Sequence, residues 1–111
     1  SRKYDLIVLT GGAWNAQVVR SDSEALTLIR NHYRARGPIA AICAGTSVLI
    51  DAGLARGLTM TGSPVVRPDL KNAGANYLDQ PLVADKGIIT SRSPDDLEYF
   101  VTGLRKILIG R

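Results

Sequence analysis

The residue type best suited to covalent chemistry occurs once in this chain, as Cys43. It lies in the segment Ala41-Ile42-Cys43-Ala44-Gly45, after an apolar run and before a stretch with helical spacing. A reactive side chain at a sharp strand-to-helix turn is the layout of a nucleophile elbow, whose usual form is G-x-S-x-G. Here cysteine replaces the serine, and Ala41 replaces the first glycine. Free amides and the positive end of the helix dipole lower the pKa of a thiol at such a corner, so we expect a reactive thiolate.

A second feature is the glycine pair Gly11-Gly12, which follows another apolar run. Ligands of open α/β sheets bind outside the carboxyl ends of the strands. The backbone N–H groups of Gly12 and Ala44 could therefore hold the oxyanion formed when Cys43 attacks a carbonyl group. The alternative is that Cys43 is a small buried core residue, as free cysteines often are. Spacing alone leaves the two interpretations about equal.

The single histidine, His32, is the obvious partner to test for Cys43. It lies near the end of a predicted helix that leads into the start of the strand before Cys43. At the usual rise per residue of a strand, the two side chains are then ~15 Å apart. We therefore expect His32 at a solvated helix position, and a histidine could reach Cys43 only from a partner subunit.

Several other polar residues allow more than one interpretation. Arg92 follows a strand end near the expected site, where it could hold a carboxylate, line a subunit contact or form an ordinary surface ion pair. Trp14 and Asn15 could form a substrate wall, and a partly exposed tryptophan also suits a subunit interface. Ser47 and Ser63 have no base nearby in sequence and are expected to act as capping or turn residues. The same is expected of Asp69, Asp79, Asp85, Asp95 and Asp96.

Composition limits the possible classes of protein. The chain has 111 residues, of which 45% are apolar and 22% charged, so it is expected to form one globular domain. One cysteine excludes an internal disulfide, and one cysteine with one histidine excludes a Cys/His zinc site. The glycine pair lacks the rest of a phosphate or dinucleotide motif, so no cofactor is expected.

Charge and hydropathy bear on the cellular location of the protein and on the kind of partner it binds. The net charge of +4 comes from scattered basic residues near predicted helix ends, which requires no nucleic-acid partner. No apolar run approaches the length of a membrane span. We expect a cytoplasmic protein that acts on a small molecule or peptide, and that binds neither nucleic acid nor membrane.

Short apolar runs alternate with stretches of helical spacing, which predicts a parallel α/β sheet with right-handed crossovers. Strands are expected at 4–9, 38–42 and 58–61, with a hairpin over 82–90. The first is apolar throughout and should lie inside the sheet. Helices are expected at 21–36, 46–52 and 68–73, and from Ser93 onward. Ser21 and Glu24 fit a capping box. The buried stripe of the last helix is expected to comprise Leu97, Phe100, Val101, Leu104, Ile107 and Leu108.

Six segments resemble the ThiJ/PfpI superfamily in order and spacing. They are YDLIVLTGG (4–12), PIAAICAG (38–45), LIDAG (49–53), TGSPVVRPDL (61–70), NAGA (72–75) and ITSRSPDDL (89–97). The resemblance implies a flavodoxin-like three-layer α/β sandwich with a mostly parallel sheet, related to class I glutamine amidotransferases. It places the family nucleophile on Cys43 and the oxyanion-hole amides on Gly12 and Ala44.

The chain departs from the superfamily pattern at three points. Ala44 stands where PfpI proteases carry a histidine after the nucleophile, and Ser63 stands where a stress-protein branch often has a histidine. Superfamily members also have a βαβ portion before the YDLIVLTGG strand, with a glutamate that hydrogen-bonds the nucleophile. We therefore expect residues 1–111 to form a single domain that lacks its N-terminal strands, ~60 residues by comparison with a typical domain.

The resemblance leads to a primary hypothesis and two alternatives. The primary hypothesis is a cysteine hydrolase, either a peptidase/amidase or glyoxalase/deglycase-like, with an unidentified base. The first alternative is a non-catalytic oxidative-stress, redox-sensing or chaperone protein in which Cys43 is oxidised. The second, a ligand-sensing domain of a transcription regulator, is disfavoured because no helix-turn-helix segment is evident. A homo-oligomer is expected, and a separate N-terminal polypeptide could complete the domain.

Overall fold

The computed structural model describes residues 5–10 and 18–109. Its main sheet has the strand order β1-β2-β6-β5, formed by Ile7–Leu9, Ile39–Ile42, Ile88–Ser91 and Val83–Asp85. β1, β2 and β6 are parallel, whereas β5 forms an antiparallel hairpin with β6. β2 is fully buried because its run of isoleucine and alanine is covered on both faces. This arrangement confirms the predicted, mostly parallel α/β sheet.

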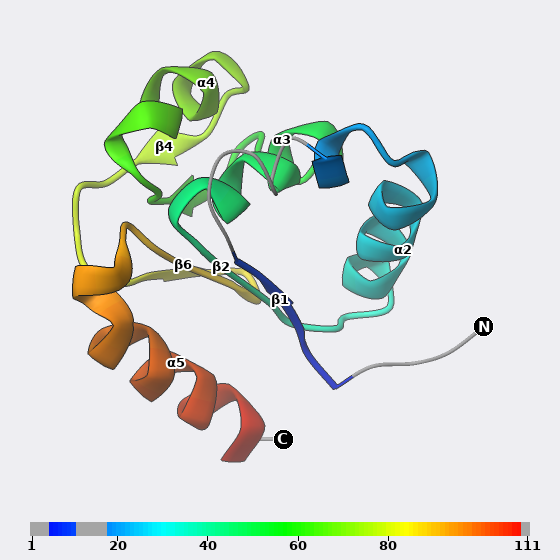
Figure 1. Cartoon of the computed structure of the whole chain (residues 1–111). Coiled ribbons are helices and arrows are strands. Elements are labelled where there is room, and N and C mark those ends of the chain that lie inside the picture. The colour runs from blue at the N-terminus through cyan, green and yellow to red at the C-terminus, as the bar shows by residue number, and fades with distance from the viewer. Residues whose placement is uncertain (1–4, 11–17, 110–111) are drawn as a thin grey trace.

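Helices cover both faces of the main sheet (Figure 1). On one face lie α2 (Ser23–Arg34) and α3 (Val48–Asp51), over a core that includes Ile39, Ala41 and Leu49. On the other face lies α5 (Leu97–Ile109), where Phe100 packs with Ala40, Ile42 and Ile89. The alternating side chains of β2 thus supply both cores. The result is a three-layer sandwich, as predicted (Figure 1).

A second, two-stranded sheet lies outside the main one. β3 (Thr59–Met60) pairs in parallel with β4 (Asn76–Tyr77), and the short helix α4 (Arg67–Asn72) connects them after the 3₁₀ turn η2 (Pro64–Val66). The predicted third strand is therefore present but does not join the main sheet. β4 was not predicted, because two polar or aromatic residues after a glycine carry no strand periodicity.

The helix starts differ in detail from the predicted ones. The carboxylate of Asp22, rather than the hydroxyl of Ser21, caps α2 by accepting from the amides of Glu24 and Ala25. The predicted capping box at Ser21 is wrong by one residue, since either side chain type can cap and spacing alone does not choose. At the last helix the prediction is confirmed: the Ser93 hydroxyl accepts from the Asp95 amide and begins the 3₁₀ turn η3 (Pro94–Asp96).

Two predicted burial patterns are only partly met. In α5, Phe100 is buried and Leu104 and Ile107 pack against the core, but Leu97, Val101 and Leu108 are exposed. β1, predicted to be interior, pairs within the described residues only with β2, and its Val8 is 43% exposed. These exposed residues of α5 and β1 are all apolar. The two elements therefore bury less apolar surface than their sequence patterns predict.

Candidate functional site

Three parallel strands end at the same edge of the main sheet. The register pairs Leu9 with Ala41 and Ile42 with Ser91, so the chain leaves β1, β2 and β6 at nearly one level. Cys43 is the first residue after β2, and Arg92 is the first after β6. The carboxyl ends of parallel strands are where α/β sheets bind ligands. This edge is the candidate site, and it is where the sequence placed it.

Cys43 occupies a backbone conformation that few residues with side chains adopt. Its φ is 59°, in the left-handed region, and it is the first residue of the 3₁₀ helix η1 (Cys43–Ser47), directly after extended Ile42. A non-glycine residue in this region costs roughly 1–2 kcal/mol. Such strain in a strand-to-helix corner is characteristic of a nucleophile elbow. The side chain is half-buried, so it is neither a fully packed core residue nor fully exposed.

Gly45 explains how the end of β1 comes close to Cys43. A Cβ at this position would lie 2.4 Å from the carbonyl oxygen of Leu9 and 3.1 Å from the amide nitrogen of Thr10. Real Cβ atoms do not come that close to backbone, so only glycine permits this contact. The chain that leaves β1 therefore begins directly against η1.

After Cys43, η1 is buried and is stabilised by a hydrogen bond between two of its own residues. Ala44 is buried, and its carbonyl oxygen accepts a 2.6 Å hydrogen bond from the Ser47 hydroxyl. Ser63, where a related branch has histidine, donates its backbone N–H to the Cys43 carbonyl at 3.4 Å. Ser47 is thus a turn residue, one of the two roles expected of it, and its side chain does not cap α3. Ser63 adjoins the site through its backbone.

A charged cluster lies near the cysteine. An ion pair was one of the alternatives expected for Arg92, but its partners, Asp79 and Asp96, were expected to be turn or capping residues. The Arg92 guanidinium binds both oxygens of Asp96, at 2.8 Å from Nε and 3.0 Å from Nη2, and binds Asp79 at 2.9 Å from Nη1. Asp96 is buried and also accepts the Arg92 backbone N–H at 3.1 Å. These hydrogen bonds from Arg92 hold the pKa of the Asp96 carboxyl below its usual range, so Asp96 is a fixed negative charge.

Burial, together with the nearby Asp96 carboxylate, raises the pKa of the Cys43 thiol. The predicted lowering is therefore wrong for the described surroundings. Two features explain the difference. Burial of the half-buried thiol disfavours its charged form, and Asp96, in the 3₁₀ turn η3 that precedes α5, opposes a second negative charge.

The remaining candidates lie elsewhere or outside the described residues. His32 donates from Nε2 to the Pro38 carbonyl at 2.8 Å, at the opposite end of β2 from Cys43. The predicted placement at the far end of the strand from Cys43 is confirmed, although His32 is half-buried against Gly37 rather than solvated. Gly12, Trp14 and Asn15 fall outside the described residues.

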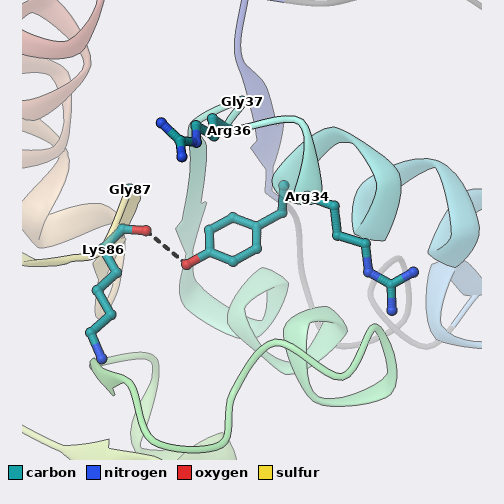
Figure 2. A pocket seen from close by; sticks show the side chains of 6 residues that line it. Arg34, Arg36, Gly37, Lys86 and Gly87 are labelled. Carbon is teal, nitrogen blue, oxygen red and sulfur yellow. Dashed lines mark hydrogen bonds between the residues drawn. The ribbon is translucent and has the colours of Figure 1, made fainter.

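A hollow of about 470 Å³ lies at that opposite end of the sheet. Its lining includes Tyr33, Arg34, Arg36 and Lys86. The Tyr33 hydroxyl donates to the Lys86 carbonyl oxygen at 2.8 Å. Figure 2 shows that the side chains of Arg34, Arg36 and Lys86 extend in different directions. The basic groups do not converge on one point, so the chemistry of the strand ends identifies the site better than the hollow does.

Three buried hydroxyls of the described residues have no hydrogen-bond partner there: Thr46 Oγ1, Thr61 Oγ1 and Ser91 Oγ. All belong to segments at the carboxyl ends of strands. Burying a hydroxyl without a hydrogen-bond partner costs free energy of folding. The three hydroxyls also make this end of the core more polar than the apolar runs of the strands indicate. No group of three His, Cys, Asp or Glu side chains in the described part of the chain could hold a metal ion. Nor does any helix described there have the length and apolar character to span a membrane.

Comparison with known proteins gives matching relatives. "Putative cysteine protease YraA" of Bacillus subtilis is 40% identical over 97 residues, 87% of this chain and 57% of that protein. "Protein/nucleic acid deglycase 2" of Escherichia coli is 38% identical over 99 residues, 88% of this chain and 57% of that protein. The chain thus spans less than two thirds of the length of either relative.

Solved structures agree with the fold. The crystal structure of Drosophila melanogaster DJ-1beta matches with a TM-score of 0.91 and 34% identity, covering 98% of this chain and 59% of that one. The sandwich is therefore the flavodoxin-like fold of these proteins. The model of the DJ-1/PfpI family matches residues 1–106. The elbow, the strand order and these matches together show that the chain belongs to the DJ-1/PfpI family.

Proposed function

We propose that this chain carries the nucleophile of a cysteine hydrolase that acts on small carbonyl, amide or peptide substrates. The observation that carries the proposal is the left-handed conformation of Cys43, φ 59°, at the carboxyl end of a buried strand. Two relatives named as a protease and a deglycase support the same chemical class. Both names describe reactions at carbonyl-derived carbon, for which a thiolate is a suitable nucleophile.

The proposed reaction begins with attack of the Cys43 Sγ thiolate on the carbonyl carbon of the substrate. The new C–S bond moves an electron pair onto the carbonyl oxygen, and the amides of Gly12 and Ala44 are assigned to hold that oxyanion. For an amide, collapse of the intermediate expels the amine and leaves a thioester, which water hydrolyses to the acid and free thiol. The proton taken from Cys43 returns to the leaving amine.

The raised pKa of Cys43 sets a requirement on this mechanism. A thiol with a pKa above its ordinary value is largely protonated near neutral pH, so attack needs a base. Asp96 is poorly suited to that role, because Arg92 binds both of its carboxylate oxygens. The superfamily resemblance assigns such a partner to a glutamate in the N-terminal portion. We therefore propose that the complete catalytic unit includes groups from outside the described residues.

The test is turnover of a small amide and of an α-oxoaldehyde by the chain and by Cys43→Ser. The hydrolase proposal expects Cys43→Ser to abolish turnover and Ser47→Ala to retain most of it. Turnover that survives in Cys43→Ser would refute the proposal. A peroxide-dependent gain in mass at Cys43 without turnover would instead favour the redox-sensing alternative.

A further inference from the structure

Arg92 is held asymmetrically, with one side of its guanidinium locked and the other side exchangeable. Nε and Nη2 donate to Asp96, whose side chain is 5% exposed, in a bidentate pair that fixes the plane of the guanidinium. Nη1 donates instead to Asp79, whose side chain is 74% exposed. A contact with so exposed a carboxylate contributes little, so another carboxylate can replace it at small cost.

The place of Arg92 in the sheet puts this exchangeable donor near the nucleophile. Ile42 and Ser91 are paired in neighbouring parallel strands, and Cys43 and Arg92 are the next residues of those strands. Neighbouring strands lie about 5 Å apart. Among the described charged groups, Asp96 acts on the Cys43 thiol through its charge, which shows that the cluster is within electrostatic range of the sulfur.

The locked half of the guanidinium gives Arg92 the properties of a pre-organised anion receptor. An arginine fixed by a buried carboxylate loses little side-chain entropy when it binds a ligand. Its remaining N–H donors match the geometry of a planar carboxylate. Asp79 then occupies the receptor until a ligand carboxylate takes its place.

We propose that Arg92 binds a carboxylate of the substrate whose carbonyl group Cys43 attacks, and that this carboxylate displaces Asp79 from Nη1. The inference rests on the proposed function of Cys43 and deepens it. The substrate class that it names is a small carbonyl or amide compound with a carboxylate close to the reacting carbon. A neutral substrate of the same size would lack this contact and bind less well.

The test compares iodoacetate with iodoacetamide as reagents for Cys43. In both reactions the Sγ thiolate forms a C–S bond and displaces iodide, but only iodoacetate carries a carboxylate. The ratio of the two second-order rate constants cancels the thiolate fraction, so a change in the pKa of Cys43 does not alter it. We expect a ratio above that of free cysteine under the same conditions, and a fall to or below the free-cysteine value in Arg92→Gln.

Asp79→Asn gives the sharper comparison because it removes the carboxylate charge that competes for Nη1, without changing Arg92 itself. We expect it to raise the ratio roughly two- to fivefold, the range of an exposed ion pair. Asp95→Asn is the matched control, since it removes a charge from the same turn at an exposed residue, and within the described part of the chain the Asp95 side chain makes no hydrogen bond to Arg92. It should leave the ratio nearly unchanged.

An unchanged ratio in Asp79→Asn, or equal rises in Asp79→Asn and Asp95→Asn, would overturn the proposal. If Arg92→Gln does not fold, the comparison of the two aspartate variants decides alone. These outcomes are distinct from failure of the proposed function. That failure appears as turnover that survives in Cys43→Ser, whatever the ratio of alkylation rates.

Discussion

Replacing Gly45 by alanine tests the close contact between the end of β1 and the elbow. The new Cβ would lie 2.4 Å from the Leu9 carbonyl oxygen and 2.7 Å from the Leu9 carbonyl carbon, whereas ordinary contacts begin at 3.4 Å. These contacting atoms belong to the backbone, so β1 and η1 must move apart by about 1 Å, because no side chain can turn aside to make room. The site geometry and the stability should therefore both suffer.

The size of the effect follows from two opposing contributions. Overpacking of this kind costs roughly 2–3 kcal/mol, since no flexible atom can yield. Gly45 is not in a left-handed conformation, so alanine would otherwise stabilise the chain by roughly 0.5–1 kcal/mol. The net loss of unfolding free energy is about 2 kcal/mol. For a domain of this size, that lowers the melting temperature by roughly 8–12 °C.

The assay is thermal and urea unfolding followed by circular dichroism, with Gly103→Ala as the control. In α5 the added Cβ would meet only the ends of flexible side chains, 3.1 Å from Ile89 Cδ1 and 3.3 Å from the Leu82 methyl groups. The gain in helix propensity offsets that repacking, so the control should stay within about 1 kcal/mol of the parent chain. The contact argument fails if Gly45→Ala is as stable as the parent or loses no more than Gly103→Ala.

Three further predictions concern reactivity, the far end of the sheet and association. When the alkylation rate of Cys43 is titrated against pH, its midpoint should lie above the free-thiol value of ~8.5. The midpoint should fall in Asp96→Asn, because that variant removes the negative charge that opposes the thiolate. A midpoint at or below ~8.5 in the parent chain would contradict this prediction. His32→Ala should lower the free energy of unfolding by about 1 kcal/mol, because it removes the hydrogen bond to the Pro38 carbonyl. The alkylation rate of Cys43 should not change. A slower rate would show that His32 acts on Cys43 after all. By light scattering, the chain should associate through the β1 edge, and Val8→Lys should weaken association; a parent chain that stays monomeric at micromolar concentration would refute this.

The parts of the site that could be predicted from the sequence are those set by local pattern. The apolar run before Cys43 and the small residues after it predict a buried strand and a tight corner, and both are found. Ser93 and Pro94 similarly mark a helix start through local hydrogen bonding and a fixed φ. His32 could be placed far from Cys43 because the length of one strand sets their separation.

The parts that could not be predicted depend on contacts between distant segments. Asp96 belongs to an acidic first turn, which is usually solvated, and only folding shows that Arg92 and Asp79 surround it to make a buried charge. The pKa of Cys43 depends on that charge, so a prediction from the local helix start alone gave the wrong direction. The pairing of β3 with β4 also joins residues too few to show a period.

The outward face of α5 shows a related limit. Leu97, Val101 and Leu108 match the helical period as well as Phe100 does, yet they are exposed while Phe100 is buried. At roughly 100° per residue the six predicted positions form one stripe about 120° wide, and only the side of it that carries Phe100, Leu104 and Ile107 meets the sheet. Periodicity therefore finds the stripe but does not fix how the helix is rotated on the sheet. The same holds for Val8, whose exposure depends on what lies beside β1 rather than on its own type.

The central claim, that Cys43 is a nucleophile toward carbonyl carbon, is tested most directly by trapping its acyl intermediate. The chain would be mixed with the activated ester p-nitrophenyl acetate, quenched in acid and analysed by intact mass and peptide mapping. Our account predicts one acetyl group per chain, on the peptide that contains Cys43, and none in Cys43→Ser. Acetylation of other residues alone, or an equal acetyl content in Cys43→Ser, would contradict it.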